Sequence, residues 1–264
     1  MSNLQMKDVI KELKDLYSFN SKHSNYQILS SRLNDILEEN SLLIKSRHEK
    51  ERLAYILSKL EVKDKTILDI GGNSGYFTFE LIDKGAKSVH YYEGNSIHAQ
   101  FVKLASKVLL VEDKIKIDNK YFTFDSKNKI MYDIAICMNV LHHIGDDYGN
   151  KELSIENAKQ MISKQLCSLA KSARYVIFQM GFNWKGDVKS PLFMNGTKME
   201  MINFLKSSIY NHFIIKDIGI AENDPNSNNI KYKDLNNVNN QRNDELGEFL
   251  NRPLFILESI KLNN

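Results

Sequence analysis

Residues 66–77 read TILDIGGNSGYF, and this stretch carries the strongest structural signal in the chain. Positions 66–70 are β-branched or apolar except for Asp69, a composition typical of a buried strand. Glycines stand at 71, 72 and 75, and an apolar segment begins at Tyr76. This order predicts a strand, a tight turn and a helix. The glycines would let a ligand lie against the backbone, although a simple turn with a surface aspartate is the plainer alternative.

The segments around this stretch alternate between strand-like and helix-like patterns. Such alternation indicates βαβ units and therefore an α/β fold, Rossmann-like and doubly wound, with a mostly parallel sheet of seven strands. The predicted strands are 66–70, 88–92, 114–118, 132–137, 174–180, 212–218 and 253–260. The predicted helices among them are 76–84, 96–108, 154–171 and 197–209.

Two regions depart from this alternation. Residues 1–60 have apolar residues at helical spacing and neither proline nor glycine, so we expect an N-terminal helical cap before a binding domain at 61–264. The last helix of this cap has Ser46 as its predicted N-cap and Glu49 in capping-box position. Residues 221–249 are polar and rich in asparagine, which is typical of a long surface loop.

The composition is that of a soluble globular protein. The 264 residues include 42% hydrophobic and 26% charged residues, and the net charge is +3. Lysine and arginine are scattered along the chain and form no block that could follow a phosphate backbone. Nucleic acid is therefore not the expected partner.

The cysteines and the apolar runs bear on location and on metal binding. Cys137 and Cys167 lie in apolar surroundings without metal-ligand spacing, so we expect reduced thiols and no metal site. No apolar run approaches the roughly 20 residues that cross a bilayer. The first residues, MSNLQMKDVIKEL, lack the apolar core of a signal peptide. These features predict a cytoplasmic protein without a membrane span.

Two carboxylates define the expected ligand. Asp69 stands at the carboxyl end of the first strand, where doubly wound sheets bind ligands, and Glu93 ends the second strand about 20 residues beyond the glycines. The dinucleotide pattern G-x-G-x-x-G would need glycines at 73 and 76, which are Asn and Tyr. An acid before the glycines would repel a pyrophosphate but suits a ligand with an ammonium and a sulfonium group. S-adenosylmethionine has both.

At this point the sequence resembles the class I S-adenosylmethionine-dependent methyltransferases. The motifs that carry the resemblance are LDIGGNSGYF, the acidic end of HYYEGN, and YDIAICMNVLHHI at 132–144. The resemblance covers residues 65–180 well and the last two predicted strands loosely. It implies the doubly wound fold and S-adenosylmethionine as cofactor.

The resemblance also implies roles for single residues. It assigns the methionine amino group to Asp69, the shape of the pocket to Gly71 and Gly75, the ribose to Glu93, the adenine to Asp118 and Asn119, and the methionine part to the backbone near Met138 and Asn139. Asn73, counted with the cofactor contacts, stands where many members carry a third glycine. An aspartate after a strand often serves only to form a turn. The alternative for Asp118 is therefore a turn-forming role without contact to the adenine.

The pair His142 and His143 follows the fourth predicted strand, and in the family this position faces the transferred methyl group. A hydroxyl acceptor needs a base, and a neutral histidine can serve near pH 7. His143 is the first candidate for this base and His142 the second. The alternative is that the two are a structural pair, with one packed inward.

Three further segments are candidates for binding the acceptor. Trp184 and Lys185 lie in a segment after the fifth predicted strand that has little helix or strand pattern. Arg252 re-enters the sheet from the polar loop, and its guanidinium suits an anionic acceptor. Lys22 and His23 interrupt the helical cap. Trp184 could equally anchor its own loop, and residues 22–27 could be an ordinary turn between helices.

We therefore interpret the sequence as a methyltransferase that acts on a small or saccharide-linked polar acceptor. Short patches are similar to methyltransferases encoded with bacterial surface-polysaccharide enzymes, which implies O-methylation of a sugar hydroxyl or a phosphate-type oxygen. A second interpretation is an RNA methyltransferase, because the glycine-rich motif also looks like enzymes that modify tRNA wobble uridines. A third is a protein that binds S-adenosylmethionine without catalysis.

Overall fold

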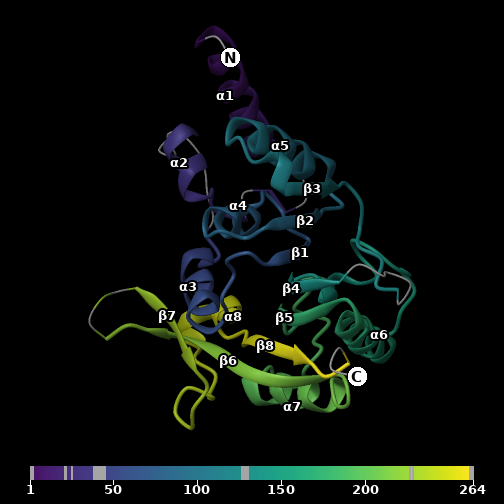
Figure 1. Cartoon of the computed structure of the whole chain (residues 1–264). Coiled ribbons are helices and arrows are strands. Elements are labelled where there is room, and N and C mark those ends of the chain that lie inside the picture. The colour runs from purple at the N-terminus through teal and green to yellow at the C-terminus, as the bar shows by residue number, and fades with distance from the viewer. Residues whose placement is uncertain are drawn as a thin grey trace. The chain divides into compact units, whose positions relative to one another are not determined.

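The computed structural model describes residues 3–20, 23–24, 26–37, 46–125, 131–225, 227 and 229–261. Its contacts divide the chain into two compact units. The first unit comprises 1–49 and 61–122, and the second comprises 50–60 and 123–264. Each unit contributes helices and strands of its own (Figure 1). The predicted division into a cap at 1–60 and a domain at 61–264 stays a prediction.

The first unit contains a parallel three-stranded arrangement in the order β3-β2-β1. All but the first residue of β1 are buried, and so are the first seven residues of α4. Continuous apolar runs of this kind are expected where parallel strands are covered on both faces. The elements of this unit are α1 (Asn3–Ser18), α2 (Ser31–Leu37), β1 (Thr66–Ile70), α4 (Tyr76–Asp83), β2 (Ser88–Tyr92), α5 (Ser96–Val108) and β3 (Ile115–Asp118).

In the second unit the strand order is β4-β5-β8-β6-β7, with β4 and β5 parallel and the later pairs antiparallel. Helix α3 (Glu49–Lys59) enters this unit after its first residue. The other elements are β4 (Tyr132–Met138), α6 (Ile155–Ser168), β5 (Ala173–Gln179), α7 (Lys198–Ser208), β6 (Phe213–Asn223), β7 (Ile230–Asp234), α8 (Gly247–Leu250) and β8 (Leu254–Ser259). Within the described parts of the chain, no helix is long and apolar enough to cross a membrane.

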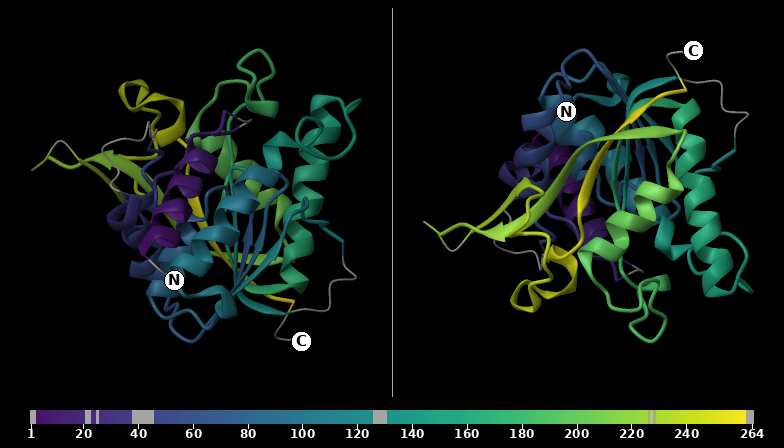
Figure 2. Two further views of the ribbon diagram at one scale, coloured as in Figure 1. Left: turned by 90° about the horizontal axis from the view of Figure 1, so that it is seen from above. Right: turned by 90° about the horizontal axis from the view of Figure 1, so that it is seen from below.

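The α/β, Rossmann-like prediction is confirmed, but the strand count was wrong. The described residues form eight strands, not seven. The predicted strand at 212–218 continues to Asn223 and pairs with β7 in a long hairpin, which both views of Figure 2 show. Strand β7 alternates apolar and charged residues over only five positions, which is too short to stand out in a polar segment. Its lysines pair with carboxylates at the end of β6: Lys231 contacts Asp224, just after the strand, and Lys233 contacts Glu222.

The asparagines of the predicted loop at 221–249 hold its backbone in defined turns. The Asn239 side chain accepts a hydrogen bond from the amide of Asn236, and its carbonyl accepts one from the buried Lys198 ammonium at 3.0 Å. Asn251, just beyond the predicted loop, donates from Nδ2 to the carbonyls of Asn243 and Gly247 within it. Asparagine side chains form hydrogen bonds with the backbone of turns in this way. The asparagine-rich composition of this segment therefore goes together with an ordered local structure.

The N-terminus of α4 is capped by a residue from far upstream. Gly75 is its N-cap residue and supplies no side-chain bond, but Gln27 Oε1 accepts from the Tyr76 amide at 2.9 Å and from Ser74 Oγ at 3.1 Å. We expect Gln27→Ala to lower the free energy of unfolding by about 1 kcal/mol, because a buried helix amide loses its acceptor. Urea denaturation measures this. The exposed Gln100→Ala on α5 is the control, and equal midpoints for the two variants would refute the capping role.

Candidate active site

The glycine-rich turn follows β1 in the first unit and runs through left-handed backbone. Gly71 has φ 69°, Asn73 φ 51° and Gly75 φ 81°. Asparagine tolerates this conformation better than most residues, which accounts for its presence where the family often has glycine. Gly72 is required for another reason, a close approach of a side chain. A Cβ at this position would lie 2.5 Å from the Tyr91 ring.

Asp69 lies beneath this turn and is 2% exposed. Its Oδ2 accepts a hydrogen bond from the Thr78 hydroxyl at 2.7 Å. Burial raises the pKa of Asp69 from its ordinary value of 3.8 to about 6, and the negative charge of Glu93 adds to the increase. The carboxylate is therefore held at a fixed place although its burial is unfavourable for the charged form. Groups with pKa values perturbed in this way are typical of binding sites.

Glu93 follows β2 and points to the glycine-rich turn. Its Oε2 accepts from the Asn73 amide at 2.9 Å, and its Oε1 accepts from the Asn95 amide at 2.8 Å. Both carboxylate oxygens are thereby held beside the turn that follows β1. The structure thus brings Glu93 together with Asn73, and the role of Glu93 toward a ribose stays a prediction.

The residues predicted beside the adenine are engaged with the protein. Asp118 Oδ2 lies 2.8 Å from His90 Nε2, and Asn119 Nδ2 donates to the Glu93 carbonyl at 2.9 Å. Asn119 therefore stays close to the ribose-binding candidate, whereas Asp118 is directed toward β2. His23, from the predicted acceptor set, accepts from Asn73 Nδ2 through its carbonyl at 3.2 Å. Lys22 lies outside the described residues.

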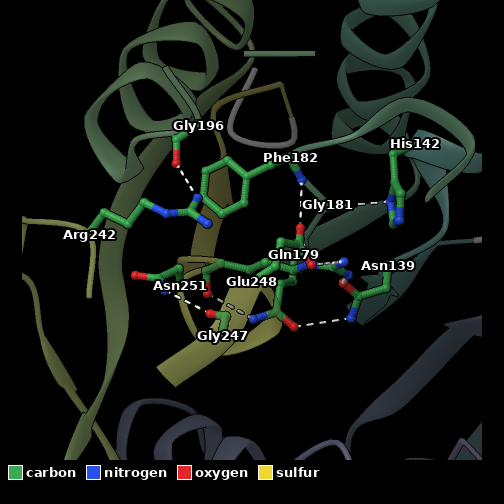
Figure 3. Close-up of polar contacts among 11 residues, drawn as sticks. Asn139, His142, Gln179, Gly181, Phe182, Gly196, Arg242, Gly247, Glu248 and Asn251 are labelled. Carbon is green, nitrogen blue, oxygen red and sulfur yellow. Dashed lines mark hydrogen bonds and ion pairs between the residues drawn. The ribbon is translucent and has the colours of Figure 1, made fainter. Parts of the chain in front are cut away.

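In the second unit, Met138 ends β4 and Asn139 follows it in left-handed backbone with φ 61°. Asn139 donates its backbone amide to the Gln179 carbonyl at 2.7 Å and its Nδ2 to Gln179 Oε1 at 3.1 Å. Its Oδ1 accepts from Arg252 Nη1 at 2.7 Å. Figure 3 shows Asn139 and Gln179 facing each other in this cluster.

The two histidines have different surroundings. His142 is 1% exposed, and its Nδ1 accepts from the Gly181 amide, as Figure 3 shows. This contact suits a packing residue. His143 is partly exposed, and its Nδ1 lies 3.6 Å from Asp147 Oδ2 and 3.9 Å from Asp146 Oδ2. A positive charge on this imidazole, which a general base acquires when it takes a proton, would lie beside two carboxylates.

The loop after β5 is anchored by its tryptophan. Trp184 is buried, and its Nε1 donates to the Ile144 carbonyl at 2.6 Å. The Lys185 ammonium lies 4.0 Å from the centre of the Trp184 ring, and Lys185 has a left-handed φ of 58°. This geometry favours the anchoring alternative for Trp184. It keeps Lys185 on the same turn as Gly186, which borders the His143 ring.

The expectation of a guanidinium open to an anionic acceptor does not fit the position of Arg252. Glu248 already binds it in a two-point contact, with Nε to Oε1 at 3.1 Å and Nη2 to Oε2 at 2.6 Å. Such a pair neutralises the guanidinium and occupies the geometry that an anion would use. Glu248, four residues upstream within the polar segment, was not predicted from the sequence as a site residue.

No protein-family model matches the chain. Solved structures share its architecture, among them the magnesium protoporphyrin IX methyltransferase of Synechocystis with bound S-adenosylmethionine. That protein is 14% identical over 94% of this chain and 89% of its own, with a TM-score of 0.50. The fold is that of the class I methyltransferases. The bifunctional kinase-methyltransferase WbdD is also similar, at 15% identity over 96% of this chain and 46% of that chain, with a TM-score of 0.50.

Curated sequences match a shorter stretch. The tRNA U34 carboxymethyltransferase of Helicobacter pylori is 26% identical over 87 residues, which is 31% of this chain and 32% of the relative. The match therefore spans about a third of the length of these relatives. The likeness to tRNA-modifying enzymes that the glycine-rich motif led us to expect is found over this stretch.

Proposed function

We propose that the protein is an S-adenosylmethionine-dependent methyltransferase. The observation that carries the proposal is the turn at 71–75 with two acids at fixed places. Asp69 is buried below the turn, and Glu93 accepts the amide of Asn73 within it. A ribose offers hydroxyls to Glu93, and a cationic methionine part is favoured by both charges. The class I fold supports the proposal.

For the acceptor, we propose a small or saccharide-linked polar molecule, methylated on oxygen as in surface-polysaccharide biosynthesis. Support comes from the short sequence patches noted above and from His143, which has carboxylates beside one ring nitrogen and therefore suits a hydroxyl acceptor. The proposed acceptor contacts are Lys185, His23 and Lys22, and the Trp184 ring anchors the loop that carries Lys185. The helices within 1–60 remain a proposed cap.

The second candidate is modification of tRNA, favoured by the match to the Helicobacter enzyme. Incubation with labelled S-adenosylmethionine and fractionated cell extract separates the candidates, because label enters either the RNA or the saccharide fraction. Steeply salt-dependent retention on a phosphate-rich resin would also favour RNA. Cofactor binding without label transfer to any fraction would favour the non-catalytic alternative.

Glu93→Gln tests the cofactor assignment. We expect the affinity for S-adenosylmethionine to fall about 10-fold or more, because a charge-assisted hydrogen bond to the ligand is lost while the side chain keeps its size. Isothermal titration calorimetry measures the affinity. The exposed Glu112→Gln is the matched control. Unchanged affinity in a folded Glu93 variant, or tighter binding of NAD than of S-adenosylmethionine, would refute the assignment.

A further inference from the structure

A hydrogen-bonded network in the second unit joins three segments that are far apart in the sequence. Glu248 precedes β8, Phe182 follows β5, and Asn139 follows β4. Glu248 Oε1 accepts from the Phe182 amide at 3.2 Å, a contact drawn in Figure 3, and the same carboxylate holds the Arg252 guanidinium. The carboxylate therefore connects the loop after β5 with the start of β8.

Arg252 carries the network on to Asn139. Its Nη1 donates to Asn139 Oδ1, which determines the orientation of the amide and directs Nδ2 to Gln179 Oε1. Gln179 is fully buried, and its Nε2 donates back to the Arg252 carbonyl at 3.1 Å. Both the side chain and the backbone amide of Asn139 are thus bound to partners that the protein itself supplies.

This support matters because the backbone of Asn139 is in the left-handed region. A residue other than glycine adopts that conformation at a cost, which surrounding contacts must outweigh. The guanidinium of Arg252 lies mostly buried beside the Phe249 ring, with 13% of its side chain exposed. The planar guanidinium is held by Glu248 and by the stacked ring, so it is a rigid hydrogen-bond donor.

We propose that Arg252 and Glu248 are positioning residues that act on the cofactor through Asn139. The inference rests on the proposed function and on the role that the family resemblance implies for the backbone at Asn139, which is to face the methionine part of S-adenosylmethionine. The network holds that backbone in its binding conformation before the ligand arrives, which lowers the ordering cost of binding. Arg252 then contributes to cofactor affinity without contacting the acceptor or the cofactor.

A double-mutant cycle tests this role. Asn139→Gly keeps the left-handed backbone accessible and removes the side chain, while Arg252→Met removes the guanidinium and keeps an apolar stem. We expect each variant to bind S-adenosylhomocysteine about 10-fold more weakly, and the double variant to be no weaker than Asn139→Gly alone. Adenosine, which lacks the methionine part, should bind all four proteins equally. Isothermal titration calorimetry measures both ligands.

Arg242→Met is the matched control. This arginine lies in the same unit and also pairs with a carboxylate, but it contacts Asp244 and the Gly196 carbonyl instead of Asn139. We expect its affinity for S-adenosylhomocysteine to be that of the wild type. Losses that add in the double variant would show that Arg252 touches the ligand itself and would overturn the positioning role. If Arg252→Met lost as much affinity for adenosine as for S-adenosylhomocysteine, the positioning role would also be overturned, because a purely structural role predicts that result.

The network can also be tested without ligand. In NMR spectra, the Asn139 side-chain amide should exchange with solvent at least 10-fold faster in Arg252→Met than in the wild type or in Arg242→Met. Unchanged exchange would overturn the positioning role whatever the ligand results. A wild-type protein that binds neither S-adenosylmethionine nor S-adenosylhomocysteine, but shows the faster exchange in Arg252→Met, would refute the proposed function and leave the network itself established.

Discussion

Removal of the His143 imidazole should lower kcat by a factor of about 10²–10⁴ if the methyl acceptor is a hydroxyl. As the oxygen attacks the methyl carbon, the C–S bond breaks and the hydroxyl proton must leave. In our proposal His143 takes that proton on Nε2, and the carboxylates of Asp146 and Asp147 near its Nδ1 stabilise the resulting imidazolium. The rate of label transfer from S-adenosylmethionine to the active extract fraction measures kcat.

Two comparisons make the His143→Ala result decisive. Affinity for S-adenosylhomocysteine should change little, and His212→Ala, on the turn before β6, should retain activity. An acceptor that is already ionised, such as a phosphate-type oxygen, needs no base, so a loss below about 10-fold would indicate that class of acceptor. A variant that loses cofactor affinity or its folded state would instead show that His143 is structural.

Asp69→Asn should affect ligand affinity and stability in opposite directions. The loss of a charged contact to the cofactor should weaken S-adenosylmethionine binding by about 10- to 150-fold, which corresponds to roughly 1.5–3 kcal/mol. The same change should make the ligand-free protein more stable at neutral pH. An amide can still accept the Thr78 hydroxyl but no longer carries a buried charge.

The pH dependence follows from the raised pKa of Asp69, which burial shifts from 3.8 to about 6. The folded protein therefore holds this proton at pH values where the unfolded chain has released it. Asp69 costs nothing below about pH 4. The cost grows between about pH 4 and 6 and then stays constant, at roughly 1–3 kcal/mol, above that range. The stability gain of Asp69→Asn over the wild type should grow through the same window.

Urea denaturation at several pH values measures this difference, and the exposed Asp113→Asn serves as control because it has no buried charge to remove. The wild-type curve alone is not sufficient, since other groups titrate in the same range. A stability difference between Asp69→Asn and the wild type that stays constant from pH 4 to 7 would contradict the assigned cause.

Much of the α/β alternation could be predicted from sequence because its signals are local. The strand at Thr66–Ile70 is a continuous apolar run, and the positive φ values at Gly71 and Gly75 need residues that accept them. Strand β7 was missed for the converse reason. Its alternation of apolar and charged residues spans only five positions, and at the edge of the sheet its lysines pair with Asp224 and Glu222.

For the candidate cofactor residues, too, some properties could be predicted from sequence and others could not. The sequence alone determined that an acid precedes the glycines at Asp69 and that another, Glu93, ends the next strand, because strand order and spacing bring these positions to one edge. It could not show that Asp69 is buried and carries a raised pKa. Desolvation depends on every neighbour that packs around a group, and those neighbours come from distant parts of the chain.

Tertiary structure alone decided the role we now assign to Arg252. From sequence it was a cation in a polar segment and therefore a candidate for an anionic acceptor. In the folded second unit Glu248 pairs with its charge, and its Nη1 donates to Asn139, 113 positions away. Periodicity and turn propensity describe neighbours along the chain. Which charge pairs with which is decided only when packing brings distant side chains within hydrogen-bonding distance.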